Sequence, residues 1–379
     1  MKEKLIKLSS YLYWKIRLAI EKRDQYKYYL RIFNGLAKIK DIKTNLLTKE
    51  QKREIDTFYR KNYGKKVSYM WHNLIMNYTN KFDVRYIPPE VFLEIINNLI
   101  TRDIKFSIFY DKNFFHNFVK RTGMYVPEKV FCSINGLFLD SADKFISKQD
   151  FYKQMSNVGE VFIKPTLPSD SGYSKNCRLI NVSNGIDVYS KTNITDMLER
   201  YYTRDFVVQK KLVCHKSISD IYSISVNTFS VHSLILNNEV KILNNVVFKI
   251  GMNGSNTDFP DPKKEGLVIA IDKEGVLSDF ALCIKQDKKY FSHPNTGVVF
   301  KNHKIENFHN AIETIKKLHS LIPWVKFCKW DITIDVDGKP VLLETEWPSE
   351  LFQQQVLYEK GFFGEYTEEI LSSLRRPKS

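Results

Sequence analysis

Three carboxylates near the C-terminal end of the chain, Asp331, Glu344 and Glu346, have the spacing of a metal site on a β-hairpin. Apolar and polar residues alternate around the first carboxylate, break at an Asp-Gly pair, and resume as an apolar run that ends in the two glutamates. An Asp-Gly pair between two such runs is typical of a hairpin turn. Pairing the runs brings Asp331 opposite Glu344 and Glu346, which share one sheet face because they are two residues apart.

Carboxylates brought this close together repel one another unless a cation neutralises them. Oxygen ligands around an open position suit Mg²⁺ that carries substrate phosphates, so the hairpin predicts a nucleotide–metal site. An exposed hairpin with its acids spread over a solvated face is the alternative, and the hairpin by itself does not decide between the two.

Two lysines stand at the ends of predicted elements, where each can contact phosphate oxygens. Asp111 and Lys112 open a predicted helix that runs to about residue 123. Lys164 lies at the end of a brief apolar strand over residues 161–165. A single lysine at a strand end is more often solvated than functional, so the prediction depends on both lysines occurring together with the acidic hairpin.

A loop and a further strand complete the predicted nucleotide-binding elements. The loop follows the Lys164 strand, and its backbone N–H groups and hydroxyls can approach phosphate oxygens. The strand spans residues 206–213, and the backbone of its last part can meet the edge of an adenine ring. The residues that these two segments contribute to the predicted nucleotide site are Ser169, Ser171, Gly172, Gln209, Lys210 and Leu212.

In this order and spacing, the elements resemble the ATP-grasp superfamily and, within it, D-alanine:D-alanine ligase and its relatives. Four further motifs are similar to those of the sugar-transfer-associated ATP-grasp family, which is linked to surface-polysaccharide synthesis. These motifs are Tyr-Ile-Pro-Pro at residues 86–89, Ser-Val-Asn-Thr at 225–228, Lys-Ile-Gly-Met-Asn-Gly at 249–254 and His-Pro-Asn-Thr-Gly at 293–297. The resemblance covers about residues 45–360, which is most of the chain.

The resemblance implies an ATP-dependent ligase that joins a carboxylate to an amine through an acyl phosphate. Lys112 and Lys164 would clamp the phosphates of ATP. Mg²⁺ or Mn²⁺ would be held by the three carboxylates of the hairpin, and Asn227 would face the nucleotide or its metal. The expected substrates are small-molecule or sugar-linked acids and amines.

Three further residues are expected to act on the substrates. Lys329 stands where relatives carry a basic residue that faces the acyl phosphate. Lys249 stands at the position of a family arginine. His293 either orients the acceptor or caps the loop that follows it.

Several positions depart from the family pattern. Glu346 stands where the superfamily usually has asparagine, so the metal site gains one negative charge. The arginine expected at residue 230 is a serine, and Lys249 differs from the arginine it replaces in hydrogen-bonding geometry. The family's Asp-Asn and Gly-Gly pairs read Asp-Phe at residues 258–259 and Glu-Gly at 265–266. These departures lie between the nucleotide and the acceptor, so they affect the identity of the substrate more than ATP binding.

The composition favours a cytoplasmic enzyme with a large core. The chain has 379 residues, of which 43% are hydrophobic and 14% aromatic, enough for two or three subdomains. Its five cysteines show no Cys-x-x-Cys spacing, and their odd number argues against a closed set of disulfides. No uncharged apolar run is long enough to span a membrane, and charged residues interrupt the apolar residues near the N-terminus, unlike in a signal peptide.

Much of the net charge of +15 lies near the N-terminus. Residues 1–40 mix lysines and arginines with apolar and aromatic side chains in the pattern of a basic amphipathic helix pair. Such a segment can lie on an anionic membrane, which would place the protein peripherally at the inner face of the membrane. A basic helical cap packed on the main domain is the alternative. No nucleic-acid-binding motif accompanies the charge, so nucleic acid is not an expected partner.

The predicted fold is mixed α/β (α+β), an ATP-grasp fold preceded by two smaller parts. Residues 1–44 are expected to form the basic helical extension, residues 45–110 a small α/β subdomain, and residues 111–365 the ATP-grasp domain. The elements expected in the small subdomain are a helix over residues 47–63 that begins with a capping box, an apolar helix over residues 90–100 and a strand over residues 104–110.

Two other functions are compatible with the same scaffold. An ATP-grasp kinase would transfer phosphate to a sugar hydroxyl without an acyl intermediate, and nothing in the sequence excludes it. A nucleotide-binding adaptor for glycosyltransferases would need no catalytic metal, so the three carboxylates argue against it. Hydroxylamine separates the kinase from the ligase, because it traps an acyl phosphate as a hydroxamate.

Overall fold

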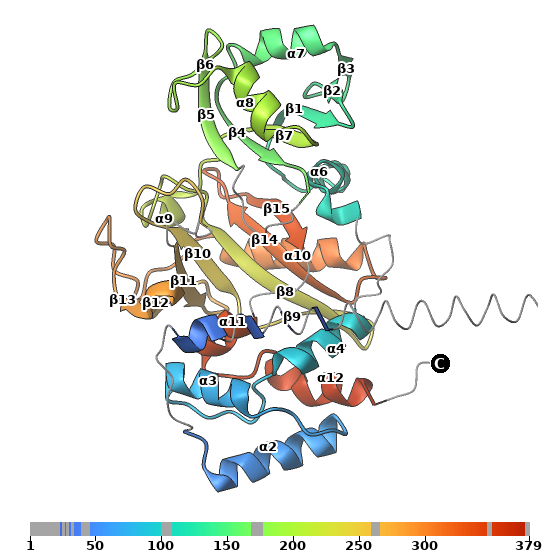
Figure 1. Ribbon diagram of the computed structural model, residues 1–379, viewed down its shortest axis with the longest axis vertical. Coiled ribbons are helices and arrows are strands. Elements are labelled where there is room, and N and C mark those ends of the chain that lie inside the picture. The colour runs from blue at the N-terminus through green and yellow to red at the C-terminus, as the bar shows by residue number, and fades with distance from the viewer. Residues whose placement is uncertain are drawn as a thin grey trace, which may run out of the picture. The chain divides into compact units, whose positions relative to one another are not determined.

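The computed structural model describes residues 46–99, 108–167, 177–258, 266–346 and 351–375, together with short helical stretches between residues 23 and 38 (Figure 1). The predicted basic extension therefore lies largely outside the described residues. The chain divides into two compact units, one made of Met1–Asn98, Lys285–Asp287 and Leu351–Ser379, and the other of Leu99–Ile284 and Lys288–Glu350. Within the described ranges, every helix falls short of the length and apolar character that crossing a membrane requires.

The first unit is helical in the part that the structure describes. Its helices are α2 (Lys49–Asn62), α3 (Met70–Thr79), α4 (Pro89–Leu99), α11 (Leu351–Tyr358), the 3-10 helix η3 (Gly364–Tyr366) and α12 (Thr367–Ser373). Thr48 and Gln51 form the predicted capping box at the start of α2. The Gln355 side chain bonds both the N–H and the carbonyl of Ile87, which joins the C-terminal helices to the N-terminal ones.

The strand predicted over residues 104–110 is wrong at its described end. Ile108–Tyr110 form the 3-10 helix η1, and the rest of the predicted strand lies outside the described residues. The Asp111 N–H bonds the Ile108 carbonyl as the chain turns into the following helix, so this end of the segment tightens instead of extending.

Seven strands of the second unit form one antiparallel sheet. They are β1 (Lys129–Ile134), β2 (Leu137–Leu139), β3 (Phe145–Ile146), β4 (Gly159–Pro165), β5 (Arg178–Ser183), β6 (Ile186–Asp187) and β7 (Phe206–Lys210), in the order β3-β2-β1-β7-β4-β5-β6. Helices α7 (Lys148–Met155) and α8 (Ile194–Tyr201) supply Phe151 and Met197 to the core on one face, where Ile163 and Val208 meet them. Because side chains alternate along a strand, Lys164 and Gln209 lie on the opposite face.

The other strands of the second unit form an eight-stranded antiparallel sheet. They are β8 (Thr228–Leu236), β9 (Glu239–Ile242), β10 (Val247–Gly251), β11 (Gly266–Ile271), β12 (Leu277–Cys283), β13 (Lys288–Tyr290), β14 (Phe327–Ile334) and β15 (Pro340–Glu346). The order is β13-β12-β11-β10-β8-β14-β15, with β9 paired to β8. The short 3-10 helix η2 (Ile284–Gln286) connects β12 and β13. All pairings between these named strands are antiparallel, which confirms a mixed helix-and-sheet fold of the α+β kind.

The two faces of the eight-stranded sheet differ in chemistry. On one face, Phe229 stacks on Phe248 and meets Phe308 of helix α10 (Phe308–Ser320), while Trp330 meets His319 of the same helix. Alternation along the strands puts polar and charged residues on the other face. The residues of this polar face are Thr228, Ser230, Lys249, Lys329, Asp331, Glu344 and Glu346.

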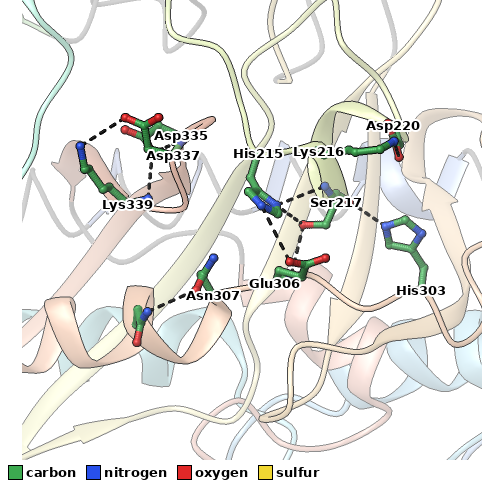
Figure 2. A network of polar contacts seen from close by, with 11 residues as sticks. His215, Lys216, Ser217, Asp220, His303, Glu306, Asn307, Asp335, Asp337 and Lys339 are labelled. Carbon is green, nitrogen blue, oxygen red and sulfur yellow. Dashed lines mark hydrogen bonds and ion pairs between the residues drawn. The ribbon is translucent and has the colours of Figure 1, made fainter.

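The segment that joins the two sheets is fixed by a network of polar contacts around the short helix α9 (Lys216–Ser219), shown in Figure 2. His215 caps this helix, with its Nδ1 3.0 Å from the Ser217 hydroxyl. The Ser217 hydroxyl accepts a hydrogen bond from the Glu306 N–H, and the Ser217 carbonyl lies 2.6 Å from His303 Nε2. These contacts hold the connecting segment against the loop that precedes α10.

Candidate active site

The C-terminal hairpin of β14 and β15 places three carboxylates and one lysine side by side. Asp331 lies opposite Glu344 in the ladder, and Lys329 lies opposite Glu346. Residues opposite each other in an antiparallel pair carry their side chains on the same face of the sheet. The hairpin expected from the sequence is therefore present, and it brings the three acids together on the polar face.

Each of the three carboxylates is paired with a buried lysine, from another strand, from the same hairpin or from helix α6 (Lys112–Arg121). The repulsion expected among the acids is thereby relieved within the protein. The nitrogen–oxygen distances are 2.8 Å for Lys249–Asp331, 3.0 Å for Lys329–Glu346 and 2.8 Å for Lys112–Glu344.

The same hairpin carries the ligand types of a divalent-cation site. Among the described residues, no three Asp, Glu, His or Cys side chains are grouped in a way that could hold a metal ion. One oxygen nevertheless fits a cation: Asp331 Oδ1 is buried and has no hydrogen-bond partner in the part of the chain that the structure describes. Leaving a buried charged oxygen without a partner is costly. For the carboxylates to share a cation, their lysines would have to turn toward other anions, such as phosphates.

Lys112 and Lys164 bring two positive charges to the same place from α6 and β4. Burial and the charge of Lys112 lower the pKa of Lys164 to about 8. Burial also opposes the charge of Lys112, but the ion pair and hydrogen bond with Glu344 outweigh it and raise the pKa of Lys112 above its ordinary value. Two ammonium groups this close favour an anion between them.

The carboxyl groups of the site differ in how readily they ionise. Burial opposes the charge of Glu344, but the charges of Lys112 and Lys164 hold its pKa well below the ordinary range. The charge of Lys329 lowers the pKa of Glu346, yet burial and the neighbouring acids leave it raised. Glu344 is therefore the more firmly ionised of the two glutamates.

A fourth carboxylate, Asp258, lies next to this group. Its side chain accepts a hydrogen bond from Thr228 on the polar face, and burial raises its pKa to about 6 despite the nearby charge of Lys249. Asp258 stands at a position where the resemblance to the family continues, although the sequence gives no sign that its side chain reaches the hairpin acids.

The strand predicted over residues 206–213 ends at Lys210, three residues early. The Gln209 side chain is buried and lies 3.0 Å from His116 Nδ1. Lys210 pairs with Glu128 at 2.6 Å, and Leu212 lies beyond the strand, half-buried. The predicted phosphate-loop residues Ser169, Ser171 and Gly172 fall outside the described residues.

Asn227 and His293 are engaged within the protein. Asn227 is fully buried; its Nδ2 donates to the Tyr222 carbonyl, and its Oδ1 accepts from the Ser225 hydroxyl and the Gly251 N–H. His293 is also fully buried, with Nε2 2.9 Å from the Gly251 carbonyl. Both side chains therefore contact the loops at the end of β10. His293 Nδ1 also lies 3.4 Å from the backbone nitrogen of Asn295 in the loop that follows it, and the two roles expected for His293 stay predictions.

Two residues beside the lysines were not singled out by sequence reasoning. Asn113 follows Lys112 in the first turn of α6, and Thr166 follows the Lys164 strand, with its carbonyl accepting from the Lys112 N–H at 3.0 Å. Both are buried, and within the described residues their side-chain polar atoms have no hydrogen-bond partner. Buried polar groups normally find partners, so these two are candidate ligand contacts. No motif marks them in the sequence.

A family model described as sugar-transfer associated ATP-grasp matches residues 96–370. That range includes both sheets and every residue of the lysine–carboxylate group. A search of curated proteins finds no matching sequence.

Several solved structures are similar to the chain at low sequence identity. They include VanG D-Ala:D-Ser ligase from Enterococcus faecalis (13% identity, TM-score 0.41, 70% of this chain and 61% of that one), an L-amino acid ligase from Bacillus licheniformis (12%, 0.35, 69% and 48%) and an ADP complex of N5-carboxyaminoimidazole ribonucleotide synthetase (12%, 0.38, 65% and 47%). The chain thus covers between 47% and 61% of the length of these proteins.

Proposed function

The chain belongs to the sugar-transfer associated ATP-grasp family, and we propose that it is an ATP-dependent ligase that joins a carboxylate to an amine through an acyl phosphate. The observation that carries the proposal is a group of four buried lysines around the three carboxylates of the hairpin: Lys249 and Lys329 on the polar face of the same sheet, Lys112 on α6 and Lys164 on β4. Such a group suits a reaction that brings several anions together, namely a triphosphate and a carboxylate beside the carboxylates that would hold a metal.

The residues present fit a bound divalent cation. Asp331, Glu344 and Glu346 would hold Mg²⁺ or Mn²⁺, with the unpartnered oxygen of Asp331 as the first candidate ligand. The cation would neutralise charge on the transferred phosphoryl group. The fold contributes by keeping all three carboxylates on one face of a rigid hairpin.

The lysines bind and orient the reacting anions. Lys112 and Lys164 would contact phosphate oxygens of ATP, and each would form a charged hydrogen bond with a phosphate oxygen. Lys112 would leave its ion pair with Glu344 to do so. Lys249 and Lys329 flank Asp331, at 2.8 Å and 3.8 Å from the same carboxylate oxygen, so they would hold the substrate carboxylate and then the acyl phosphate. Fixing both reactants in this way lowers the barrier mainly through orientation.

The proposed reaction has two displacements. An oxygen of the substrate carboxylate bonds to the γ-phosphorus of ATP, and ADP leaves with the electron pair of the broken P–O bond. The amine nitrogen then bonds to the acyl carbon, inorganic phosphate leaves, and the proton of the amine passes to solvent or to the phosphate. Both leaving groups are anions that the lysines stabilise.

The nucleotide base is proposed to meet the backbone that follows β7, at Gln209, Lys210 and Leu212. Ser169, Ser171 and Gly172 are proposed to contact the phosphates. The substrates are proposed to be sugar-linked or amino-acid components of a surface polysaccharide, handled in the cytoplasm. The description of the family as sugar-transfer associated supports the sugar-linked class.

Hydroxylamine trapping tests the proposal. The purified protein is incubated with ATP, Mg²⁺, hydroxylamine and a panel of sugar acids and amino acids, and hydroxamate and ADP are quantified by mass spectrometry. The ligase should form ADP and a hydroxamate in equal amounts with one class of acid. A phosphorylated sugar without hydroxamate would establish the kinase instead, and ATP binding without ADP formation would leave only the adaptor.

Two variants serve as controls for this assay. Lys249→Met should abolish the hydroxamate, because it removes a cation from the acyl-phosphate position. Lys339→Met removes a lysine of the same hairpin that is exposed at the turn and pairs with Asp337 at 3.2 Å, so it should leave the yield unchanged. Equal loss in both variants would show that the effect does not come from the proposed site.

A further inference from the structure

A β-bulge at Leu343 determines which way Glu344 points. Along β15 the partners change from Glu344 opposite Asp331 directly to Leu342 opposite Ile332, so Leu343 is an extra residue in the ladder. In a regular strand, residues two apart share one face. Here the bulge places Leu342 with Ile332 on the apolar face and Glu344 with Asp331 on the polar face.

The carbonyl of the bulged residue is held by a histidine. Leu343 O lies 2.7 Å from Nε2 of His116, a buried residue of α6. His116 follows Lys112 by one helical turn, so both side chains leave the same side of the helix. Lys112 lies 2.8 Å from the Glu344 carboxylate. Helix α6 therefore contacts the backbone of the bulge through His116 and the carboxylate of Glu344 through Lys112.

The protonation of His116 follows from its two neighbours. A carbonyl oxygen can only accept, so Nε2 carries the proton that bonds Leu343. Burial and the charge of Lys164 lower the pKa of His116 to about 3, which leaves Nδ1 bare. The Gln209 amide, 3.0 Å from Nδ1, must then donate to it. Gln209 thus fixes the tautomer that the bulge requires, and it comes from the strand proposed to meet the nucleotide base.

We propose that His116 is a positioning residue that holds the Leu343 bulge and thereby aims Glu344 at the nucleotide site. It does so without contact to substrate, through one hydrogen bond to the carbonyl before Glu344. The inference rests on the proposed function, in which Glu344 helps to hold the metal. Residues that orient metal ligands in this way are a general feature of metal sites.

Two substitutions at position 116 separate the effect of the hydrogen bond to Leu343 O from the effect of side-chain packing. In His116→Gln the side-chain amide reaches the place of Nε2 and can still donate to Leu343 O. In His116→Asn the amide is too short to reach it. Both variants keep a polar side chain of similar size, so each should fold, and a difference between them reports the bond to the bulge.

The first readout is hydrogen exchange followed by mass spectrometry, without any ligand. The peptide that contains β15 should exchange at the parent's rate in His116→Gln and at least about tenfold faster in His116→Asn, because the bulge is no longer held. The second readout is the Mg²⁺ concentration that gives half-maximal ATP binding in calorimetric titration. It should rise by about tenfold or more in His116→Asn, the usual effect of losing a partner of a metal ligand, and by much less in His116→Gln.

His319 provides a matched control. It is also fully buried, lies on α10 and uses both ring nitrogens, with Nδ1 2.7 Å from the Ser233 hydroxyl and Nε2 2.7 Å from the Val325 carbonyl. It is placed on the apolar side of the sheet, away from the polar face. His319→Asn should lower stability but leave both the exchange of β15 and the Mg²⁺ requirement at the parent values.

The outcomes separate this inference from the proposed function. Parental exchange of β15 in His116→Asn, or the same change in His319→Asn, would overturn the positioning role. A parent protein that binds no ATP would overturn the proposed function, while the exchange result would still decide whether His116 holds the bulge. Rescue by His116→Gln in both readouts would support the inference.

Discussion

Replacing Lys112 with methionine removes an ion pair whose energetic weight follows from the structure. The Lys112 and Glu344 side chains are 11% and 26% exposed, and their charged atoms lie 2.8 Å apart. Removing one partner of a buried pair typically costs about 3–5 kcal/mol, because the other charge is left buried without a partner. Glu344 is partly exposed and Lys164 still adds a positive charge nearby, so we expect a loss of about 1–3 kcal/mol in the free energy of unfolding at pH 7.

The size of this loss should depend on pH. The charges of Lys112 and Lys164 outweigh burial and hold the pKa of Glu344 well below its ordinary value of 4.5. A carboxylate whose pKa is lowered by folding stabilises the protein above its unfolded-state pKa, and that contribution disappears as the pH falls through the folded-state pKa. The difference between parent and variant should therefore be complete at neutral pH and decrease below pH 4.5.

Urea denaturation of parent and variant at pH 7 and at about pH 3.5 measures both effects, since contributions common to the two proteins cancel. Lys112→Arg keeps the charge and should lose less than the methionine variant. Lys339→Met breaks an exposed pair on the same hairpin and should cost less than about 1 kcal/mol. If Lys112→Met cost no more than Lys339→Met at pH 7, or cost the same at both pH values, the reasoning about this pair would be wrong.

Three further predictions concern the nucleotide, the metal and the N-terminus. ATP affinity should fall as the pH rises through about 8, where Lys164 loses its proton. Calorimetric titrations of the parent and of Lys164→Met should show this pH dependence only in the parent. At pH 7 the variant should bind ATP more weakly than the parent by about 1–3 kcal/mol. Glu346→Asn should keep the fold and ATP turnover but raise the Mg²⁺ needed for half-maximal turnover, and an unchanged requirement would show that Glu346 is no ligand. Deleting residues 1–40 should abolish salt-sensitive co-sedimentation with anionic vesicles, whereas equal sedimentation of the truncated protein would leave the helical-cap alternative.

The hairpin was predictable because its information is local. The alternation of side chains, the Asp-Gly turn and the two-residue spacing of Glu344 and Glu346 together specify one antiparallel pair with its acids on one face. The helix that begins at Lys112 was predictable for a similar reason, since Asp111 is a strong N-cap. The mixed helix-and-sheet class followed from these patterns, and the family from its motifs.

The pairing of Lys249 with Asp331 and of Lys112 with Glu344 was not predictable, because it depends on contacts between distant parts of the chain. Lys249 meets Asp331 only through the order in which β10, β8 and β14 pair. The bulge at Leu343 shifts the alternation by one residue, and its effect is visible only once the register is known. His116 carries no motif, and its role depends on a backbone carbonyl more than two hundred residues later in the chain.

The segment Ile108–Tyr110 was predicted wrongly. The apolar residues before Asp111 read as a strand by composition, yet a short apolar run fits a strand or a tight helix equally well. The structure forms the 3-10 helix Ile108–Tyr110 there, since the adjoining cap of α6 turns the chain. The N-terminal cap of α6 therefore decided the conformation of these residues more than their own strand propensity did.

The central claim, that the group of lysines and carboxylates around the hairpin binds ATP together with a divalent cation, can be tested without knowing the acid or the amine. Calorimetric titration with ATP, with and without Mg²⁺, is carried out on the parent, on Glu344→Gln and on Glu306→Gln, whose side chain is 68% exposed near α9. Mg²⁺ should tighten ATP binding in the parent and in Glu306→Gln, and this gain should be lost in Glu344→Gln. Equal gains in all three proteins, or a parent that does not bind ATP, would contradict the account.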